Sequence, residues 1–194
     1  MTSPLPEGEI LAQAAAALKK GGVIIFPTEG IYGISCNCSD IDALRRVISL
    51  KQRAEHKGLI VVADSMQRIE GLVYLDRLCD QIKNNLGSYW PGHNTILVPA
   101  REKVPSLLCG DSGSLAVRIT NFRPLADLVD LCGFPLVSTS ANLSGGQGVS
   151  TPEGLDDVFS GRVDFIARLP CGGSGVSSTI IDGTSGKVLR EGKI

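Results

Sequence analysis

Short apolar runs rich in β-branched residues recur along this chain and constrain its fold more than any other feature. They are "VIIFP" (23–27), "LIVVA" (59–63), "TILVPA" (95–100), "LAVRIT" (115–120) and "PLVSTS" (135–140). Runs of this length, closed by proline or by polar residues, are typical of buried strands. The sequence therefore predicts a sheet whose central strands are covered by other elements.

Helical patterns separate the early strands, whereas the late strands follow one another directly. Helices are predicted at 8–20, 41–50, 65–87, around 124–131 and from 152, and further strands near 163–168, 176–182 and 187–190. This order favours an α/β fold with a twisted, mixed β-sheet and flanking helices over a pure βαβ array. A chain of 194 residues without an evident linker is predicted to form one domain over residues 1–194.

Charge and composition narrow the possible functions. Nineteen basic residues against twenty acidic ones give a net charge of −1, whereas nucleic-acid-binding domains usually carry a basic excess. Any bound anion is therefore expected to be small and locally held. The N-terminus lacks a signal-peptide pattern, and no run approaches the roughly 20 apolar residues that span a bilayer. We predict a cytoplasmic protein without membrane or DNA contact.

The densest group of cations is "KQRAEHKGL" (51–59). Lys51 and Arg53 follow the predicted helix, and in an extended segment they would point to the same side. Arginine binds phosphate oxygens bidentately, and lysine adds a compact positive charge. The alternative is a solvated cluster that the dipole of the preceding helix stabilises.

Arg118 interrupts a strand that is otherwise apolar and β-branched. Because arginine is almost never buried without a partner, Arg118 either has an internal carboxylate or awaits an anionic ligand. Of these two possibilities we favour the ligand.

Two further clusters, "PTEGIYG" (27–33) and "STSAN" (138–142), place hydroxyl groups and glycine-rich backbone at strand ends. Open α/β sheets bind ligands at such ends, although a plain turn and a helix N-cap would also explain the two sequences. No P-loop, nucleophile elbow or multi-histidine metal pattern is present in the sequence. Taken together, the clusters suit a phosphate-bearing ligand and a second small polar substrate.

These segments resemble, in chain order, the motifs of the YrdC/Sua5 family. The matching stretches are "PTEGIYG", "KQR…KGL", "WPG", "LAVRIT", "STSANLSG" and "SSTIID…VLR". The resemblance implies a YrdC-like sheet around a deep, positively charged cavity. It also implies a nucleotidyltransferase that converts L-threonine, bicarbonate or CO2 and ATP into threonylcarbamoyl-adenylate and diphosphate, for N6-threonylcarbamoyladenosine at position 37 of ANN-decoding tRNAs.

The resemblance also implies residue roles by position. The L-threonine set would be Thr28, Tyr32, Arg118, Ser138 and Ser178. The ATP set would be Lys51, Arg53, Glu55, Ser114, Ser140, Asn142, Gly148 and Arg190, with Lys51 and Arg53 as the catalytic pair. Mg2+ would be carried by the phosphates, with no metal site on the protein.

The sequence departs from the family pattern in three places: Ala54 and Glu191 replace usual prolines, and His93-Asn94 replace a proline and an apolar residue after "WPG". The partners that the resemblance implies are downstream tRNA-modifying proteins of the TsaB, TsaD and TsaE type, with possible tRNA contact. The alternative is a non-catalytic module of the same fold that binds tRNA or double-stranded RNA. Near-zero net charge and 5% aromatic residues argue against it.

Overall fold

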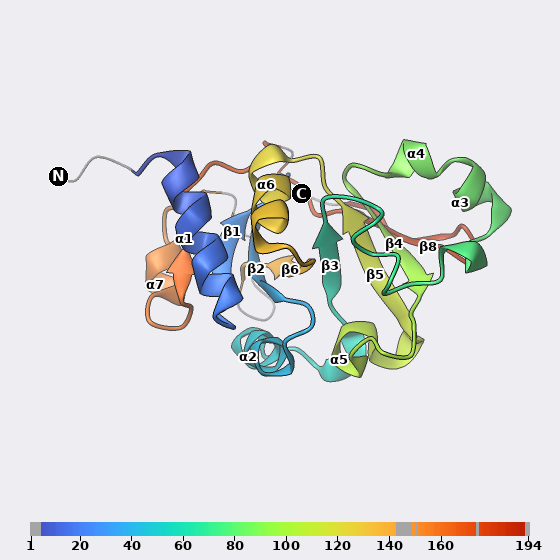
Figure 1. The fold of residues 1–194 in the computed structure, drawn as a ribbon, viewed down its shortest axis with the longest axis horizontal. Coiled ribbons are helices and arrows are strands. Elements are labelled where there is room, and N and C mark those ends of the chain that lie inside the picture. Colours follow the sequence, from blue (N-terminus) through green and yellow to red (C-terminus); the bar gives the residue numbers. More distant parts are fainter. Residues whose placement is uncertain (1–4, 143–148, 150, 174, 193–194) are drawn as a thin grey trace.

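The computed structural model describes residues 5–142, 149, 151–173 and 175–192. Within these residues nine strands form one sheet in the order β7-β1-β2-β6-β3-β5-β4-β8-β9 (Figure 1). Three neighbouring pairs are parallel (β1–β7, β3–β5 and β4–β8) and the other five are antiparallel, so the sheet is mixed, as predicted. The strands are β1 (Ile24–Pro27), β2 (Tyr32–Asn37), β3 (Ile60–Ala63), β4 (Asn94–Pro99), β5 (Ser114–Ile119), β6 (Leu136–Ser140), β7 (Phe165–Ile166), β8 (Thr179–Asp182) and β9 (Val188–Arg190).

Helices flank the sheet on both faces. Helices α1 and α6 pack against each other over one face, where Figure 1 shows them side by side. Residues of α2, α3, α5 and α7 contribute to the core on the other face. The helices are α1 (Glu7–Lys19), α2 (Ile41–Lys51), α3 (Asp80–Asn84), α4 (Leu86–Tyr89), α5 (Ser106–Cys109), α6 (Arg123–Cys132) and α7 (Leu155–Phe159).

The two-residue period of a strand divides the sheet into two surfaces. Ile25 pairs with Ile34, and both lie in the larger core together with α2. Ile24 and Val62 lie in the second core, under α1 and α6. Each central strand therefore contributes to two apolar layers, which explains why the sequence reads as unbroken apolar runs.

The sheet face under α1 and α6 changes from apolar to polar along β6. Leu136 belongs to the second core, and Ser138 and Ser140 follow at two-residue intervals, so all three side chains share one face of the sheet. On β5 the same face carries Ser114, Ala116 and Arg118, because Val62 pairs with both Leu136 and Arg118. Beyond the two helices this face is therefore polar, and it forms the floor of a cavity.

The structure corrects two predicted elements. Residues 65–87 are not one helix: they contain the 3-10 turn Leu75–Arg77 and only the short helix α3, and α4 begins at Leu86. The apolar side chains of this segment pack in the core individually and not as one helical face, and Val73 forms a β-bridge with Ala100. Tertiary contacts therefore outweigh the helical propensity of the segment. Strand β2 was not predicted, because Gly33 and Ser35 interrupt its apolar pattern on the cavity face.

A tight contact between two loops fixes the segment after Arg53. The 3-10 turn Glu55–Lys57 ends at Gly58, and the Leu59 amide donates to the Leu108 carbonyl over 2.9 Å. Gly110 has φ +57°, and a Cβ atom there would lie 2.1 Å from the His56 carbonyl oxygen. Only glycine fits this position, so Gly110 holds the loop of residues 55–58 in place.

We expect Gly110→Ala to lower the free energy of unfolding by about 3 kcal/mol or more, because a strained backbone region and a backbone clash add together. Gly113→Ala is the matched control: its φ is also positive at +64°, but nothing lies within 4 Å of the added Cβ. That variant should lose only about 1 kcal/mol. Urea unfolding measures both values, and equal losses would show that the contact with the loop of residues 55–58 is unimportant.

Candidate active site

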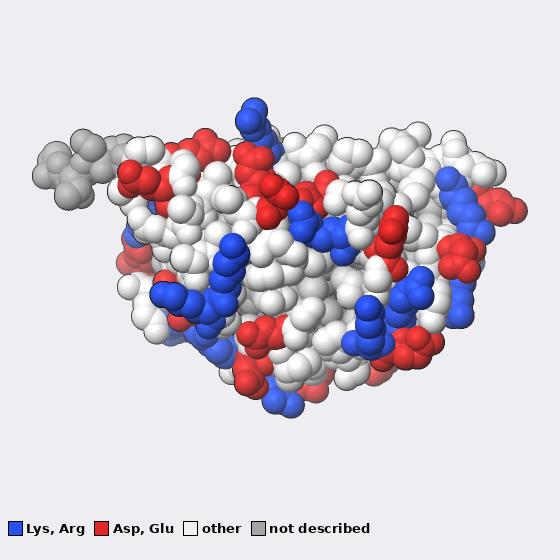
Figure 2. Space-filling model, in the orientation of Figure 1, with Lys and Arg blue, Asp and Glu red and all other residues white. Residues whose placement is uncertain are grey.

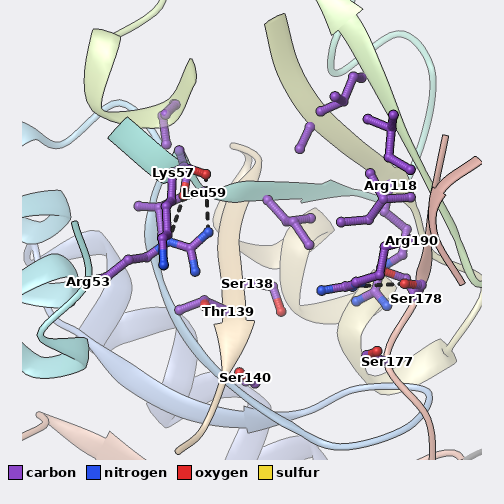
Figure 3. Close-up of a pocket in the computed structure, with 18 of the residues that line it drawn as sticks. Arg53, Lys57, Leu59, Arg118, Ser138, Thr139, Ser140, Ser177, Ser178 and Arg190 are labelled. Atoms are coloured by element: carbon purple, nitrogen blue, oxygen red, sulfur yellow. Dashed lines mark hydrogen bonds between the residues drawn. The ribbon is translucent and has the colours of Figure 1, made fainter. Parts of the chain in front are cut away.

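A cavity of about 380 Å3 opens on the polar end of this sheet face. Figure 3 shows Arg53 on one side and Arg118 and Arg190 on the other, with Ser138 and the following residues of β6 between them. Burial lowers the pKa of all three guanidinium groups, and the charge of Arg190 lowers that of Arg53 further. Cations that repel one another across a cavity are stabilised when an anion enters between them.

Arg53 reaches the cavity because the chain turns sharply after α2. Lys51 is the last helical residue, and Gln52 takes the left-handed conformation with φ 47°. The guanidinium then donates from Nε to the Gly58 carbonyl over 2.9 Å and from Nη2 to the Lys57 carbonyl over 3.1 Å. These bonds hold the half-buried Arg53 as part of the cavity wall, which favours a role in the site over the alternative of a solvated surface cluster.

Lys51 does not line the cavity, which corrects the expectation of an extended segment with Lys51 and Arg53 on one side. Its side chain is buried, and Nζ donates to the Ser140 carbonyl over 2.7 Å and to the Asn142 carbonyl over 3.0 Å. It also contacts Ser140 Oγ at 3.2 Å and Asn142 Oδ1. The ammonium group therefore fixes the end of β6.

Burial and, to a smaller extent, the charge of Arg53 together lower the pKa of Lys51 to about 8. The surrounding oxygen atoms favour the charged form and limit this effect. The contact between α2 and the end of β6 is therefore sensitive to pH just above neutrality.

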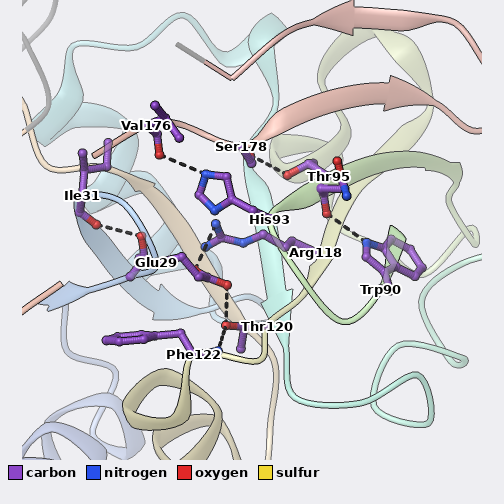
Figure 4. Close-up of polar contacts among 12 residues, drawn as sticks. Glu29, Ile31, Trp90, His93, Thr95, Arg118, Thr120, Phe122, Val176 and Ser178 are labelled. Atoms are coloured by element: carbon purple, nitrogen blue, oxygen red, sulfur yellow. Dashed lines mark hydrogen bonds and ion pairs between the residues drawn. The ribbon is translucent and has the colours of Figure 1, made fainter. Parts of the chain in front are cut away.

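Arg118 has an internal carboxylate partner, contrary to our preference for a ligand in place of one. Its Nη1 lies 3.2 Å from Glu29 Oε2, and Thr120 donates from Oγ1 to Glu29 Oε1 over 2.6 Å (Figure 4). Arg118 nevertheless lines the cavity, and its Nε is buried without a hydrogen-bond partner among the described residues. The ion pair therefore orients the guanidinium and leaves one donor uncommitted.

Hydroxyl groups complete the wall near Arg118. Thr28 donates from Oγ1 to the Ile31 carbonyl over 2.8 Å, and Ser178 Oγ lies 2.8 Å from Thr95 Oγ1. Arg190 donates from Nη2 to the Ser178 carbonyl over 2.8 Å, which ties β9 to this part of the wall. The wall thus combines one cationic donor with several groups that can donate or accept.

The structure brings most of the predicted site residues together. The cavity is lined by Thr28, Tyr32, Arg53, Ser114, Arg118, Ser138, Ser140, Ser178 and Arg190. Glu55 and Asn142 do not line it, and Gly148 lies outside the described residues. Tyr32 needs a further correction, because its side chain is fully buried and its hydroxyl donates to the Leu169 carbonyl over 2.5 Å. That hydroxyl therefore forms a hydrogen bond within the protein interior.

Sequence reasoning missed several cavity residues. Both histidines, His56 and His93, line the cavity, although neither was among the predicted site residues. Ser112 and Ser177 also line it, as does Lys57 of the predicted cation cluster. The dipeptide His93-Asn94 at an atypical motif position was the one signal that could have drawn attention to His93.

Within the described ranges no group of three or more His, Cys, Asp or Glu side chains could hold a metal ion. In the same part of the chain no helix is long and apolar enough to cross a membrane.

Fold and cavity together define a class: an α/β protein whose mixed sheet carries an arginine-lined cavity on one face. Comparison with known proteins identifies the family. The Sua5, YciO and YrdC family model, described as "Telomere recombination", matches residues 16–192. This chain belongs to that family.

Relatives with assigned names match nearly the whole chain. A threonylcarbamoyl-AMP synthase of Chromobacterium violaceum is 40% identical over 188 residues, which is 96% of this chain and 95% of that protein. A threonylcarbamoyl-AMP synthase of Klebsiella pneumoniae is 37% identical over 192 residues, covering 99% and 100% of the two chains.

Solved structures share the fold. The crystal structure of P. abyssi Sua5 complexed with L-threonine has a TM-score of 0.88 at 29% identity. It covers 98% of this chain, and this chain spans 56% of that longer protein. The crystal structure of E. coli YciO has a TM-score of 0.82 at 23% identity, covers 98% of this chain and 92% of its own, and shows the fold alone.

Lys51→Met removes the titrating group in the contact between α2 and β6. The folded-state pKa of about 8 lies below the ordinary 10.5, so between these values the unfolded chain binds a proton that the folded chain has released. Stability then rises with pH. We expect the wild type to gain about 1–3 kcal/mol relative to the variant as pH rises through this window. Parallel denaturation curves at several pH values test this, and a constant difference would contradict it.

Arg118→Met should leave the buried Glu29 carboxylate without its cation and lower the free energy of unfolding by about 3–5 kcal/mol. Adding Glu29→Gln removes the stranded charge, so the double variant should recover more than half of that loss. A double-mutant cycle from guanidinium unfolding measures the coupling. Additive losses would mean that Arg118 and Glu29 do not depend on each other.

Proposed function

We propose that this chain is a threonylcarbamoyl-AMP synthase that joins L-threonine, bicarbonate or CO2, and ATP into threonylcarbamoyl-adenylate and diphosphate. The observation that carries the proposal is the cavity itself. Three arginines from separate elements converge on it, and serine hydroxyls lie between them. Relatives that share 37–40% identity over nearly the whole chain bear this name.

The cavity divides naturally into two subsites. The wall around Arg118 and Ser178 offers a cation beside hydroxyl groups, which suits an amino-acid carboxylate and a side-chain hydroxyl. Thr28 and Ser138 belong to the same subsite. The relative complexed with L-threonine supports an amino acid as the occupant of this wall.

The opposite side suits the triphosphate. Arg53 stands across the cavity from Arg190, and the burial of both makes an anion between them favourable. Ser114 and Ser140 add hydroxyl donors for phosphate oxygens. In this proposal Lys51 does not contact the triphosphate directly. Its ammonium group holds the end of β6 that presents Ser140.

The proposed chemistry needs positioning rather than a protein nucleophile. The α-amine of threonine adds to the carbon of CO2 and releases its proton to solvent, which gives a carbamate. A carbamate oxygen then attacks the α-phosphorus of ATP, a P–O bond forms, and the bond to the diphosphate leaving group breaks. Fixed cations around the phosphates lower the barrier by offsetting the developing charge.

Mg2+ would be held mainly by triphosphate oxygens and water, because this ion prefers oxygen ligands and keeps part of its hydration shell. When bound, it neutralises phosphate charge. Glu29, a carboxylate near the cavity, forms an ion pair with Arg118 and accepts a hydrogen bond from Thr120, so in this proposal it orients Arg118.

We further propose that the protein acts in the cytoplasm and that tRNA-modifying proteins use the adenylate that it makes.

A competing role as an RNA-binding module has less support. On the face shown in Figure 2, Lys and Arg side chains are interspersed with Asp and Glu and do not form a continuous basic surface. RNA-binding surfaces usually combine concentrated positive charge with stacking aromatics.

The purified chain should release diphosphate from ATP only when L-threonine and bicarbonate are both present. Arg53→Ala should lower kcat/KM by about a hundredfold or more, because a fixed donor to the phosphates is lost. Arg45→Ala is the matched control, since Arg45 is an exposed arginine of the adjacent helix α2. Equal diphosphate release without threonine, or full activity of Arg53→Ala, would overturn the proposal.

A further inference from the structure

His93 lies beside Arg118 in the cavity wall and has a buried ring nitrogen without a hydrogen-bond partner among the described residues. It immediately precedes β4, where Asn94 pairs with Thr179 of β8, so it lies beside the residues that precede β8. In Figure 4 the imidazole lies between Val176 and the guanidinium of Arg118. The residue lines the cavity.

The hydrogen bonding of His93 defines its tautomer. Nε2 lies 3.0 Å from the Val176 carbonyl oxygen. A carbonyl oxygen only accepts, so Nε2 must carry the hydrogen. In the neutral ring Nδ1 then offers a lone pair, and Nδ1 is buried without a hydrogen-bond partner among the described residues.

A second unpaired atom lies on the same wall. Arg118 Nε is also buried without a partner in the described part of the chain, and it is a donor. Leaving a buried polar group unpaired costs about 1–3 kcal/mol, so such groups are rare unless a ligand or water completes them. An acceptor and a cationic donor on one wall complement a ligand that carries an N–H group next to a carboxylate.

We propose that His93 is an additional substrate-binding residue, whose Nδ1 accepts a hydrogen bond from the α-nitrogen of the amino-acid substrate. The inference rests on the proposed function and deepens it, because it adds a recognition group for the amine to the Arg118 group for the carboxylate. Since Nδ1 is shielded from solvent, the contact needs a small rotation of the imidazole toward the cavity, and side-chain adjustments of this kind are common on binding.

Nuclear magnetic resonance tests the contact directly, because the chain has only two histidines. In protein labelled with 15N-histidine, Nε2 of His93 should be the protonated nitrogen. Saturating L-threonine should move the Nδ1 resonance upfield and leave His56 unchanged. Spectra of His93→Gln assign the signals, and calorimetry on the same sample verifies that threonine is bound.

The outcomes separate the two proposals. If the wild type binds no L-threonine, the proposed function fails, and this inference fails with it. If threonine binds and the Nδ1 resonance stays unchanged, or if Nδ1 carries the hydrogen, only the role of His93 is overturned.

Two variants provide a second measurement. The His93→Gln side chain can still donate to Val176 but has no acceptor at the Nδ1 position, so its Kd for L-threonine should rise about tenfold. His93→Asn places its amide oxygen near the Nδ1 position and should stay within about threefold of the wild type. The Kd for ATP should be unchanged in both variants. Equal weakening of ATP and threonine, or a stronger loss in His93→Asn, would show a merely structural role.

Discussion

Residues two apart in a strand share a face, and this geometric constraint makes one surface of the sheet serve two purposes. In β6, Leu136 packs under α1 and α6, and Ser138 and Ser140 continue the same row into the cavity. On the same face of the sheet, the row of alternating side chains in β5 ends with Arg118. The floor of the cavity is therefore continuous with the core, so strands of the central sheet, and not loops, carry this part of the candidate site.

Electrostatics sets the next level of organisation. A chain with a net charge of −1 places three arginines around one cavity, and burial lowers the pKa of each guanidinium. Carbonyl groups and Glu29 hold these cations in place without filling the cavity. The arrangement concentrates positive potential where a small polyanion would sit, whereas the face in Figure 2 stays mixed in charge.

Predictions from the sequence were correct where a local pattern is compatible with only one kind of structural environment. The apolar runs predicted strands, and Arg118 stood out because a cation in such a run needs a partner. They failed where the environment of a side chain depends on the conformation of the backbone or on a segment far away in sequence. Tyr32 looked like a ligand hydroxyl, but Leu169, far away in sequence, provides its acceptor. Lys51 and Arg53 looked alike, but one left-handed residue, Gln52, sends them to different environments.

The sequence by itself determined the α/β class and the mixed character of the sheet, because the patterns that predict strands and helices are local. Its polar interruptions also marked Thr28, Arg53 and Arg118 of the cavity lining. Only the tertiary structure decided which partner each polar group has. It paired Arg118 with Glu29 and turned Lys51 toward Ser140 and Asn142. It also left Nδ1 of His93 on the cavity wall without a partner among the residues that the structure describes. Such pairings depend on the tertiary fold, which joins residues as far apart in sequence as Tyr32 and Leu169, 137 positions.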